Sequence, residues 1–90
     1  MESENLSEEE QEFLCRVHSY VEGDISRPLF YMDIDALARE MGASKDDVYV
    51  ITQKLRRHGL IEVEVAGYLE VVMVKLTPNG GTLVKELQKR

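Results

Sequence analysis

The spacing of the apolar residues changes once along this chain, at Gly59, and that change limits the folds open to it. Before Gly59, apolar residues recur at intervals of three and four, as in amphipathic helices. After it, residues 61–65 alternate strictly between apolar and acidic, Ala66-Gly67 forms a turn, and residues 68–76 form a mostly apolar second strand. Ninety residues make one domain. We therefore expect an α+β domain, mainly helical, with a two-stranded β-hairpin.

Capping residues set the expected starts of the helices. Ser7 and Glu10 form a capping box at the first helix, and Ser44 with Asp47 forms a similar pair at the third. Asp33 is expected to cap the second helix. The expected helices run from Ser7 to Gly23, from Asp33 to Gly42, from Lys45 to His58, and from Thr77-Pro78 onward.

The connection between the first two helices is expected to be a loop over residues 23–32. Pro28 lies inside it and is incompatible with a helix through the segment. The apolar run Phe30-Tyr31-Met32 favours a short strand at the end of this loop.

The acidic charge of the chain is concentrated at its N-terminus. The formal net charge is −6, and six glutamates and no base lie within residues 1–12. The other 78 residues hold eleven acids and eleven bases, so the body of the domain is neutral. We expect residues 1–6 to be a disordered acidic lead-in and residues 7–90 to form the domain. A neutral body neither excludes a nucleic-acid partner nor argues for one.

The cysteine and histidine content argues against a metal centre and against catalysis. Cys15 is the only cysteine, so neither an internal disulfide nor a zinc cluster can be drawn. His18 is one helical turn away, and a Cys–His pair can act as a nucleophile and base, but a buried thiol beside a surface histidine is the favoured interpretation. We expect a non-enzymatic cytoplasmic protein that has no cofactor, no metal and no membrane span.

The order of three helices, a hairpin and a final helix resembles the winged helix-turn-helix family, in particular transcriptional regulators of the MarR and ArsR type. The resemblance covers residues 7–89 and is carried by residues 35–42, 43–45, 54–62 and 76–80. It implies that the third helix enters the major groove of double-stranded DNA and that the hairpin, the wing, touches the DNA backbone. Because specific binding usually needs two half-sites, a homodimer is expected, with the first and last helices as its interface.

The candidate DNA-binding residues lie on the third helix, on the side opposite its apolar stripe of Val48, Ile51 and Leu55. Glutamine suits adenine, arginine suits guanine, and aspartate can accept from cytosine. Asp46 and Asp47 have an alternative role in capping and in compensating the helix dipole, and Tyr49 has one in a protein contact. The candidates are Lys45, Asp46, Tyr49, Val50, Gln53, Lys54, Arg56 and Arg57.

The predicted wing departs from a DNA-contacting pattern. Residues 61–74 contain three glutamates and no base, and the tip at residues 65–69 is short and apolar. Such a tip should avoid phosphates and is more naturally buried against a protein, through Tyr68 and Leu69. The leading prediction is a DNA-binding regulator, and the alternative is a winged-helix module for protein–protein assembly that does not bind DNA.

Overall fold

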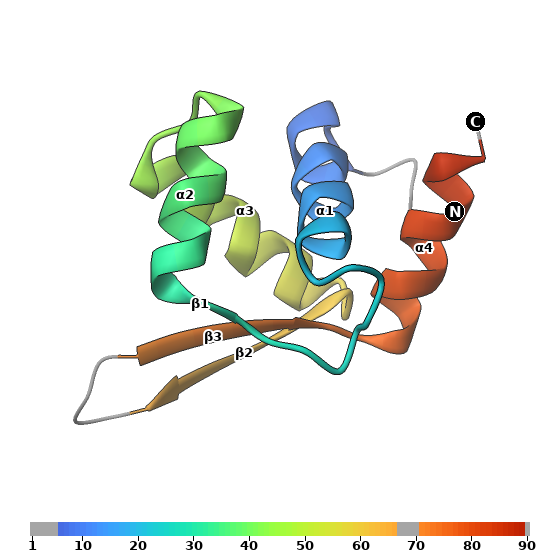
Figure 1. The fold of residues 1–90 in the computed structure, drawn as a ribbon. Helices are drawn as coiled ribbons and strands as arrows, with labels where there is room; N and C mark the ends of the chain where they lie inside the picture. The colour runs from blue at the N-terminus through green and yellow to red at the C-terminus, as the bar shows by residue number, and fades with distance from the viewer. Residues whose placement is uncertain (1–5, 67–70, 90) are drawn as a thin grey trace.

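The computed structural model describes residues 6–66 and 71–89, and within them the chain forms an α+β fold that is mainly helical. Figure 1 shows α1, α2 and α3 over one face of a small antiparallel sheet, with α4 beyond one end of it. This agrees with the predicted class. The elements are α1 (Glu8–Tyr20), β1 (Leu29–Phe30), α2 (Tyr31–Met41), α3 (Lys45–Arg57), β2 (Ile61–Ala66), β3 (Val71–Leu76) and α4 (Pro78–Gln88).

The sheet has three strands in the order β1-β3-β2: the two strands of the predicted hairpin, and β1, which overlaps the strand predicted at residues 30–32 at Phe30. Strands β2 and β3 pair without a break, from Ile61 opposite Leu76 to Ala66 opposite Val71. Strand β1 joins the other edge of β3 through Leu29, which lies opposite Val74. This element order and sheet order are compatible with a winged-helix layout.

The start of α2 differs from the prediction in two ways. The predicted strand at Phe30-Tyr31-Met32 is wrong for its last two residues, because they begin α2. Asp33 is not the N-cap: Phe30 occupies that position in extended conformation and makes no side-chain cap hydrogen bond. Asp33 instead lies in the first turn, where it suits the helix dipole, and accepts a hydrogen bond of 3.3 Å from the Tyr20 hydroxyl.

Helix α1 ends at Tyr20 with Val21 as its C-cap, before the expected end at Gly23, and the remaining helix ends agree closely with the sequence. Both predicted capping boxes form, at Ser7–Glu10 and at Ser44–Asp47. Helix α3 ends at Arg57 with His58 as its C-cap, within one residue of the expected end. Strand β3 begins at Val71, and the earlier part of the predicted strand falls in residues 67–70, outside the described residues.

The core is centred on α1 and is closed at one end by α4. Phe13, Leu14 and Val17 of α1 are almost fully buried, as is Val84 of α4, and the two helices pack together within one chain. These buried residues are thus used inside the protomer, and a homodimer interface on the first and last helices stays a prediction. Leu6 is also buried, so the packed structure begins one residue before the expected boundary, and residues 1–5 lie outside the described part.

None of the helices within residues 6–66 and 71–89 combines the length and the apolar character that a membrane span requires.

The start of α4 is fixed to the corner between α3 and β2. The Thr77 hydroxyl donates a hydrogen bond of 2.7 Å to the Gly59 carbonyl and accepts one of 3.0 Å from the Gly80 N–H. The Thr77 N–H donates to the Leu60 carbonyl at 3.1 Å. A Cβ atom at Gly80 would collide with that same carbonyl oxygen. Two stretches of backbone therefore meet at a distance that only glycine permits.

We predict that Gly80→Ala lowers the free energy of unfolding by about 2 kcal/mol, because the helix start must move away from Leu60. In an ordinary helix the same change stabilises, since alanine is the better helix former. Urea denaturation followed by circular dichroism measures the effect. Asn79→Ala, one position earlier and exposed, is the control and should stay within about 0.5 kcal/mol. An unchanged or stabilised Gly80→Ala variant contradicts the prediction.

Candidate nucleic-acid interface

Helix α3 has one side in the core and the other in solvent. Its predicted inner residues Val48, Ile51 and Leu55 are all buried. Thr52 is buried beside them, which the sequence analysis missed, and its hydroxyl donates a hydrogen bond of 2.7 Å to the Val48 carbonyl. Among the eight candidate residues Gln53 is half-buried. The other seven are exposed: Lys45, Asp46, Tyr49, Val50, Lys54, Arg56 and Arg57.

The N-terminus of α3 is acidic at the place where a phosphate would approach. The Asp47 carboxylate accepts a hydrogen bond of 3.4 Å from the Ser44 N–H, and the Ser44 hydroxyl accepts one of 3.1 Å from the Asp47 N–H. Asp47 thus has the capping role given as its alternative. Asp46 is exposed next to it. The two carboxylates compensate the positive end of the helix dipole, which weakens that end as an anion site.

Lys45 is directed toward α2. Its Nζ lies 3.9 Å from the Asp35 carboxylate and 5.6 Å from the centre of the Tyr31 ring. The Tyr31 side chain, followed by the negative charge of Asp35, raises the pKa of Lys45. Since 70% of the side chain remains exposed, this pair holds the ammonium group only weakly.

Lys54 faces α1 and pairs with a buried acid. Its Nζ lies 3.3 Å from the Glu10 carboxylate, whose side chain is only 6% exposed. The same carboxylate accepts a hydrogen bond of 2.7 Å from the Ser7 N–H. Burial raises the pKa of Glu10, but the bond from Ser7 and the charge of Lys54 together outweigh it, so the pKa lies below its ordinary value. Lys54 therefore connects α3 to α1.

The sequence contained a signal for this pair that was not used. Glu10 lies three, four and seven residues before Phe13, Leu14 and Val17, so it shares their buried face on α1. A buried carboxylate needs a cationic partner or several hydrogen bonds. That position could have predicted a lysine or arginine contact, although not which one.

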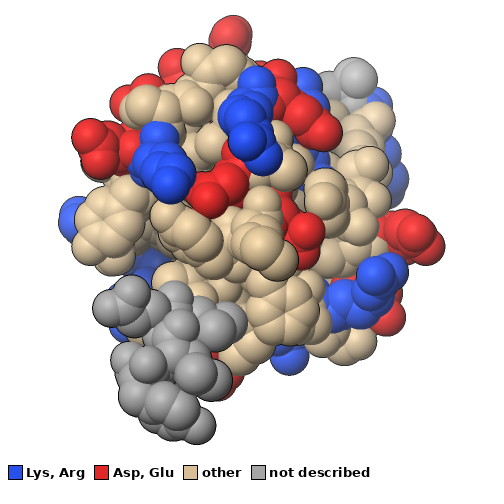
Figure 2. Space-filling model, turned by 60° about the vertical axis from the view of Figure 1, so that its left-hand side comes forward, with Lys and Arg blue, Asp and Glu red and all other residues tan. Residues whose placement is uncertain are grey.

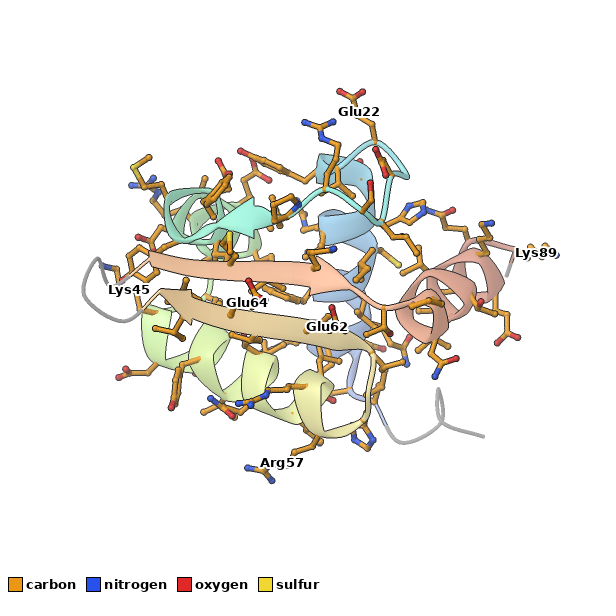
Figure 3. All side chains as sticks on the ribbon, turned by 90° about the horizontal axis from the view of Figure 1, so that it is seen from below. Glu22, Lys45, Arg57, Glu62, Glu64 and Lys89 are labelled. Carbon is orange, nitrogen blue, oxygen red and sulfur yellow. The ribbon has the colours of Figure 1, made fainter. Side chains whose placement is uncertain are left out.

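Arg56 and Arg57 are the remaining cations of α3, and neither has a side-chain partner among the described residues. Figure 3 shows Arg57 extending away from the body of the protein. Gln53 lies on the same outer side, one turn before Arg57. The exposed cations of α3 that have no acidic partner among the described residues therefore lie at its C-terminal end.

A groove of about 670 Å³ lies between the sheet and α3, along the helix from Lys45 to Arg56. Its sheet wall is apolar and made of valines, while its helical walls come from α2 and α3 and carry both charged and aromatic groups. Tyr49 and Val65 are 65% and 64% exposed, so this groove leaves large apolar side chains in water. Residues along it include Tyr31, Tyr49, Val63, Val65, Val72 and Arg56.

The charges around this region are mixed in sign. Figure 2 shows the face that carries α2 and the open end of the hairpin: lysine and arginine atoms alternate with aspartate and glutamate, and uncharged atoms lie between them. On this face the basic side chains do not join into one stripe. The described part of β2 adds Glu62 and Glu64 and no base. The proposed protein contacts Tyr68 and Leu69 lie outside the described residues.

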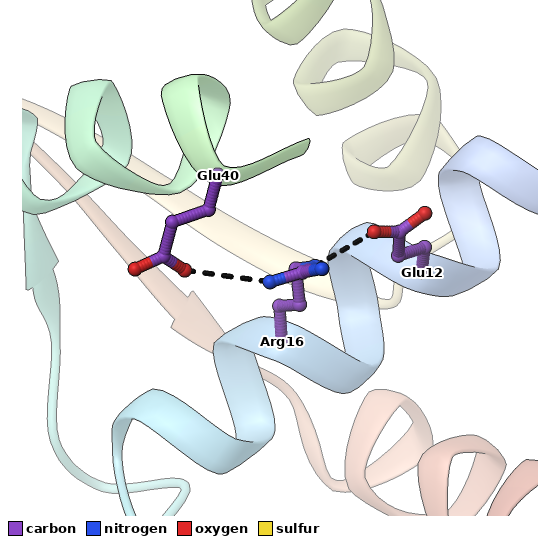
Figure 4. Close-up of polar contacts among 3 residues, drawn as sticks. All are labelled: Glu12, Arg16 and Glu40. Carbon is purple, nitrogen blue, oxygen red and sulfur yellow. Dashed lines mark hydrogen bonds and ion pairs between the residues drawn. The ribbon is translucent and has the colours of Figure 1, made fainter. Parts of the chain in front are cut away.

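A surface ion-pair network links α2 to α1 on another side of the molecule. Arg16 Nε lies 2.7 Å from the Glu12 carboxylate, and its Nη1 lies 3.4 Å from the Glu40 carboxylate near the end of α2 (Figure 4). All three side chains are between 39% and 55% exposed, so the network contributes little to stability. Arg16 thereby helps to position α1 and α2, the two helices that support α3.

Cys15 is half-buried, and burial raises the pKa of its thiol. A raised pKa disfavours the nucleophilic thiolate, which supports the interpretation of Cys15 as a packing residue. Within the described ranges no three histidine, cysteine, aspartate or glutamate residues are grouped as they would be around a metal ion.

Comparison with known proteins found no matching family model, no matching curated protein and no matching solved structure. Membership of the winged-helix family therefore stays a prediction.

We predict that Lys54→Met lowers the free energy of unfolding by about 1–2 kcal/mol, because the buried Glu10 carboxylate loses its cationic partner. Methionine keeps most of the apolar stem, so the change tests the charge. Arg57→Met, on the exposed side of the same helix, is the matched control and should stay within about 0.5 kcal/mol. Equal stability of the two variants would show that Lys54 has no structural role.

We also predict that Glu10→Gln changes how stability depends on pH. Because the folded-state pKa of Glu10 is lowered, its charge stabilises the fold above its ordinary value of 4.5, and this contribution is lost as the pH falls through the lowered value. The variant should be about 1–2 kcal/mol less stable at neutral pH. The difference should shrink toward about pH 3. Urea denaturation at both pH values measures it, and a difference that does not depend on pH contradicts the prediction.

Proposed function

We propose that this protein is a winged helix-turn-helix module that binds double-stranded DNA by inserting α3 into the major groove. The observation that carries the proposal is the outer side of α3, where Gln53, Arg56 and Arg57 project from a capped helix whose inner side is packed in the core. The resemblance of residues 7–89 to winged helix-turn-helix regulators also implies a role in transcriptional regulation.

The dimensions of α3 suit this role. Its 13 residues span about 20 Å, which is enough to cross the major groove. Helix α2 precedes it after a turn that begins at Gly42, in left-handed conformation, and the β2–β3 hairpin follows it. The helix, the supporting helix and the hairpin thus have the order that a winged-helix contact requires.

The residues divide into base-reading and phosphate-contacting groups. Gln53 suits adenine, and either arginine can bind guanine or a phosphate. Lys54 pairs with Glu10 and Lys45 lies beside Asp35, so the contribution of each to phosphate binding is reduced. In the described part of the wing, β2 supplies no base and β3 supplies Lys75, which lies opposite Glu62. Affinity should therefore be modest and should depend on two arginines per protomer.

We predict salt-dependent DNA binding with a shallow slope. Two phosphate contacts give a slope of about −2 for log affinity against log salt, which is about a tenfold loss between roughly 50 and 200 mM salt. A dimer on two half-sites doubles the slope. Fluorescence anisotropy with labelled genomic fragments measures both quantities. Failure to bind at low salt would remove the DNA-binding proposal.

Variants on α3 and on α4 test whether the arginines of α3 make the DNA contact. Replacing Arg56 and Arg57 together by alanine should weaken binding about tenfold or more. Lys85→Ala removes an exposed cation from α4 and should leave the affinity unchanged. If the α4 variant weakens binding as much as the α3 variant, net charge rather than α3 accounts for the binding.

A second candidate function, a winged-helix module for protein–protein assembly, is favoured by the groove beside α3. Its valine wall and the exposed Tyr49, Val50 and Val65 are more typical of a protein contact than of a phosphate contact. A stable protein complex, combined with no DNA binding, would favour this candidate over the first.

A further inference from the structure

Strand β2 has an open edge. In the sheet order β1-β3-β2, and among the described residues, β2 pairs only with β3. Every second residue of Ile61–Ala66 therefore directs its backbone N–H and C=O away from the sheet. Natural edge strands are usually interrupted by lysine, proline or a bulge. Strand β2 has no lysine, proline or bulge, and the charges that protect its edge are the acids Glu62 and Glu64, which repel an acidic strand and attract a basic one.

The two faces of β2 differ in chemistry. Val63 and Val65 face the groove beside α3. Glu62 and Glu64 lie on the outer face of the sheet, as Figure 3 shows from below. Glu62 is opposite Lys75 on β3, whereas Glu64 is opposite Met73 and has no cation across from it. A strand placed beside β2 would meet apolar groups on one face and negative charge on the other.

We propose that the β2 edge binds an extended segment of another protein in which apolar and basic residues alternate, as a fourth strand of the sheet. Backbone hydrogen bonds to β2 hold the segment. Its apolar side chains extend the valine wall of the groove, and its lysines or arginines lie beside Glu62 and Glu64. This proposal rests on the protein contact of the second candidate function, and it requires neither the presence nor the absence of DNA binding.

Charge selects this partner over a second copy of the chain. If β2 paired with β2 of another copy, a register that matches the valine faces would place the glutamates of both strands side by side. Like charges directly across two strands are destabilising. A register that matches the faces and separates the glutamates, with Glu64 opposite Ala66, pairs only residues 64–66 of the two strands. The alternating acids therefore disfavour self-pairing and favour a basic segment.

Binding of a synthetic strand to the full chain tests the proposal. The probe is a blocked hexapeptide of alternating lysine and valine, and NMR chemical shifts of the backbone amides locate it. We expect shifts and slowed hydrogen exchange in residues 61–66. A peptide of alternating glutamate and valine should bind at least about tenfold more weakly. The lysine peptide with an N-methylated backbone should also bind at least about tenfold more weakly, because it cannot form the strand hydrogen bonds.

Two variants separate the strand contact from general attraction to an acidic protein. Glu64→Gln should lower the affinity for the lysine peptide about threefold. Glu86→Gln on α4 removes an equally exposed acid and should have no effect. Equal affinity for the N-methylated peptide, or shifts confined to residues outside β2 and the groove, would overturn the proposal.

A DNA titration on the same samples distinguishes the two functions. Weaker DNA binding in an Arg57→Ala variant, whose side chain does not line the groove, with peptide binding retained, leaves the strand proposal standing. Absence of peptide binding, with DNA binding intact, overturns the strand proposal alone.

Discussion

The contact between Glu10 and Lys54 joins α1 to α3 and holds α3 in the orientation that burial of Val48, Ile51 and Leu55 gives it. The Glu10 carboxylate is buried at the start of α1, where it completes the capping box and also binds an ammonium group from α3. Because a buried carboxylate without a cation is costly, the contact favours the orientation in which Lys54 lies toward α1. Gln53 and Arg57 are thereby left on the outer side, so the candidate surface is a consequence of how the helix is held.

The same contact reduces the positive charge that α3 offers to a partner. Four cations lie on or at the ends of this helix, and two of them have acidic neighbours inside the protein. The exposed surface is consequently divided along the helix. Its N-terminal half is acidic and apolar, with Asp46, Tyr49 and Val50, and its C-terminal half is basic. Because Gln53 and Arg56 also line the groove that Tyr49 lines, a DNA contact and a protein contact would share part of this face.

The parts of the fold that depend on local interactions could be predicted from the sequence. The starts of α1, α3 and α4 follow from side chains that bond to backbone within three residues, at Ser7, Ser44 and Thr77. The start of α2 could not be predicted this way, because it depends on Leu29 pairing with Val74 far along the chain. Phe30-Tyr31-Met32 has strand-like composition, and only that distant pairing shows where the strand ends.

The candidate site follows the same division between local and distant interactions. Helical periodicity was sufficient to place the outer side of α3, since exposure repeats along one element. The roles of its lysines required the positions of α1 and α2, which periodicity does not give. Lys45 and Lys54 look equivalent to Arg56 and Arg57 in the sequence, and only their neighbours Asp35 and Glu10 distinguish them.

The close approach at Gly80 makes tolerance to substitution very uneven at this corner of the molecule. The Leu60 partner in that approach is a carbonyl oxygen, which every amino acid possesses, so the geometry places no demand on the side chain there. Position 80 admits a hydrogen atom and nothing larger without rearrangement. The orientation of α4, and with it the closure of the core over α1, is therefore encoded by the absence of a side chain at a single position.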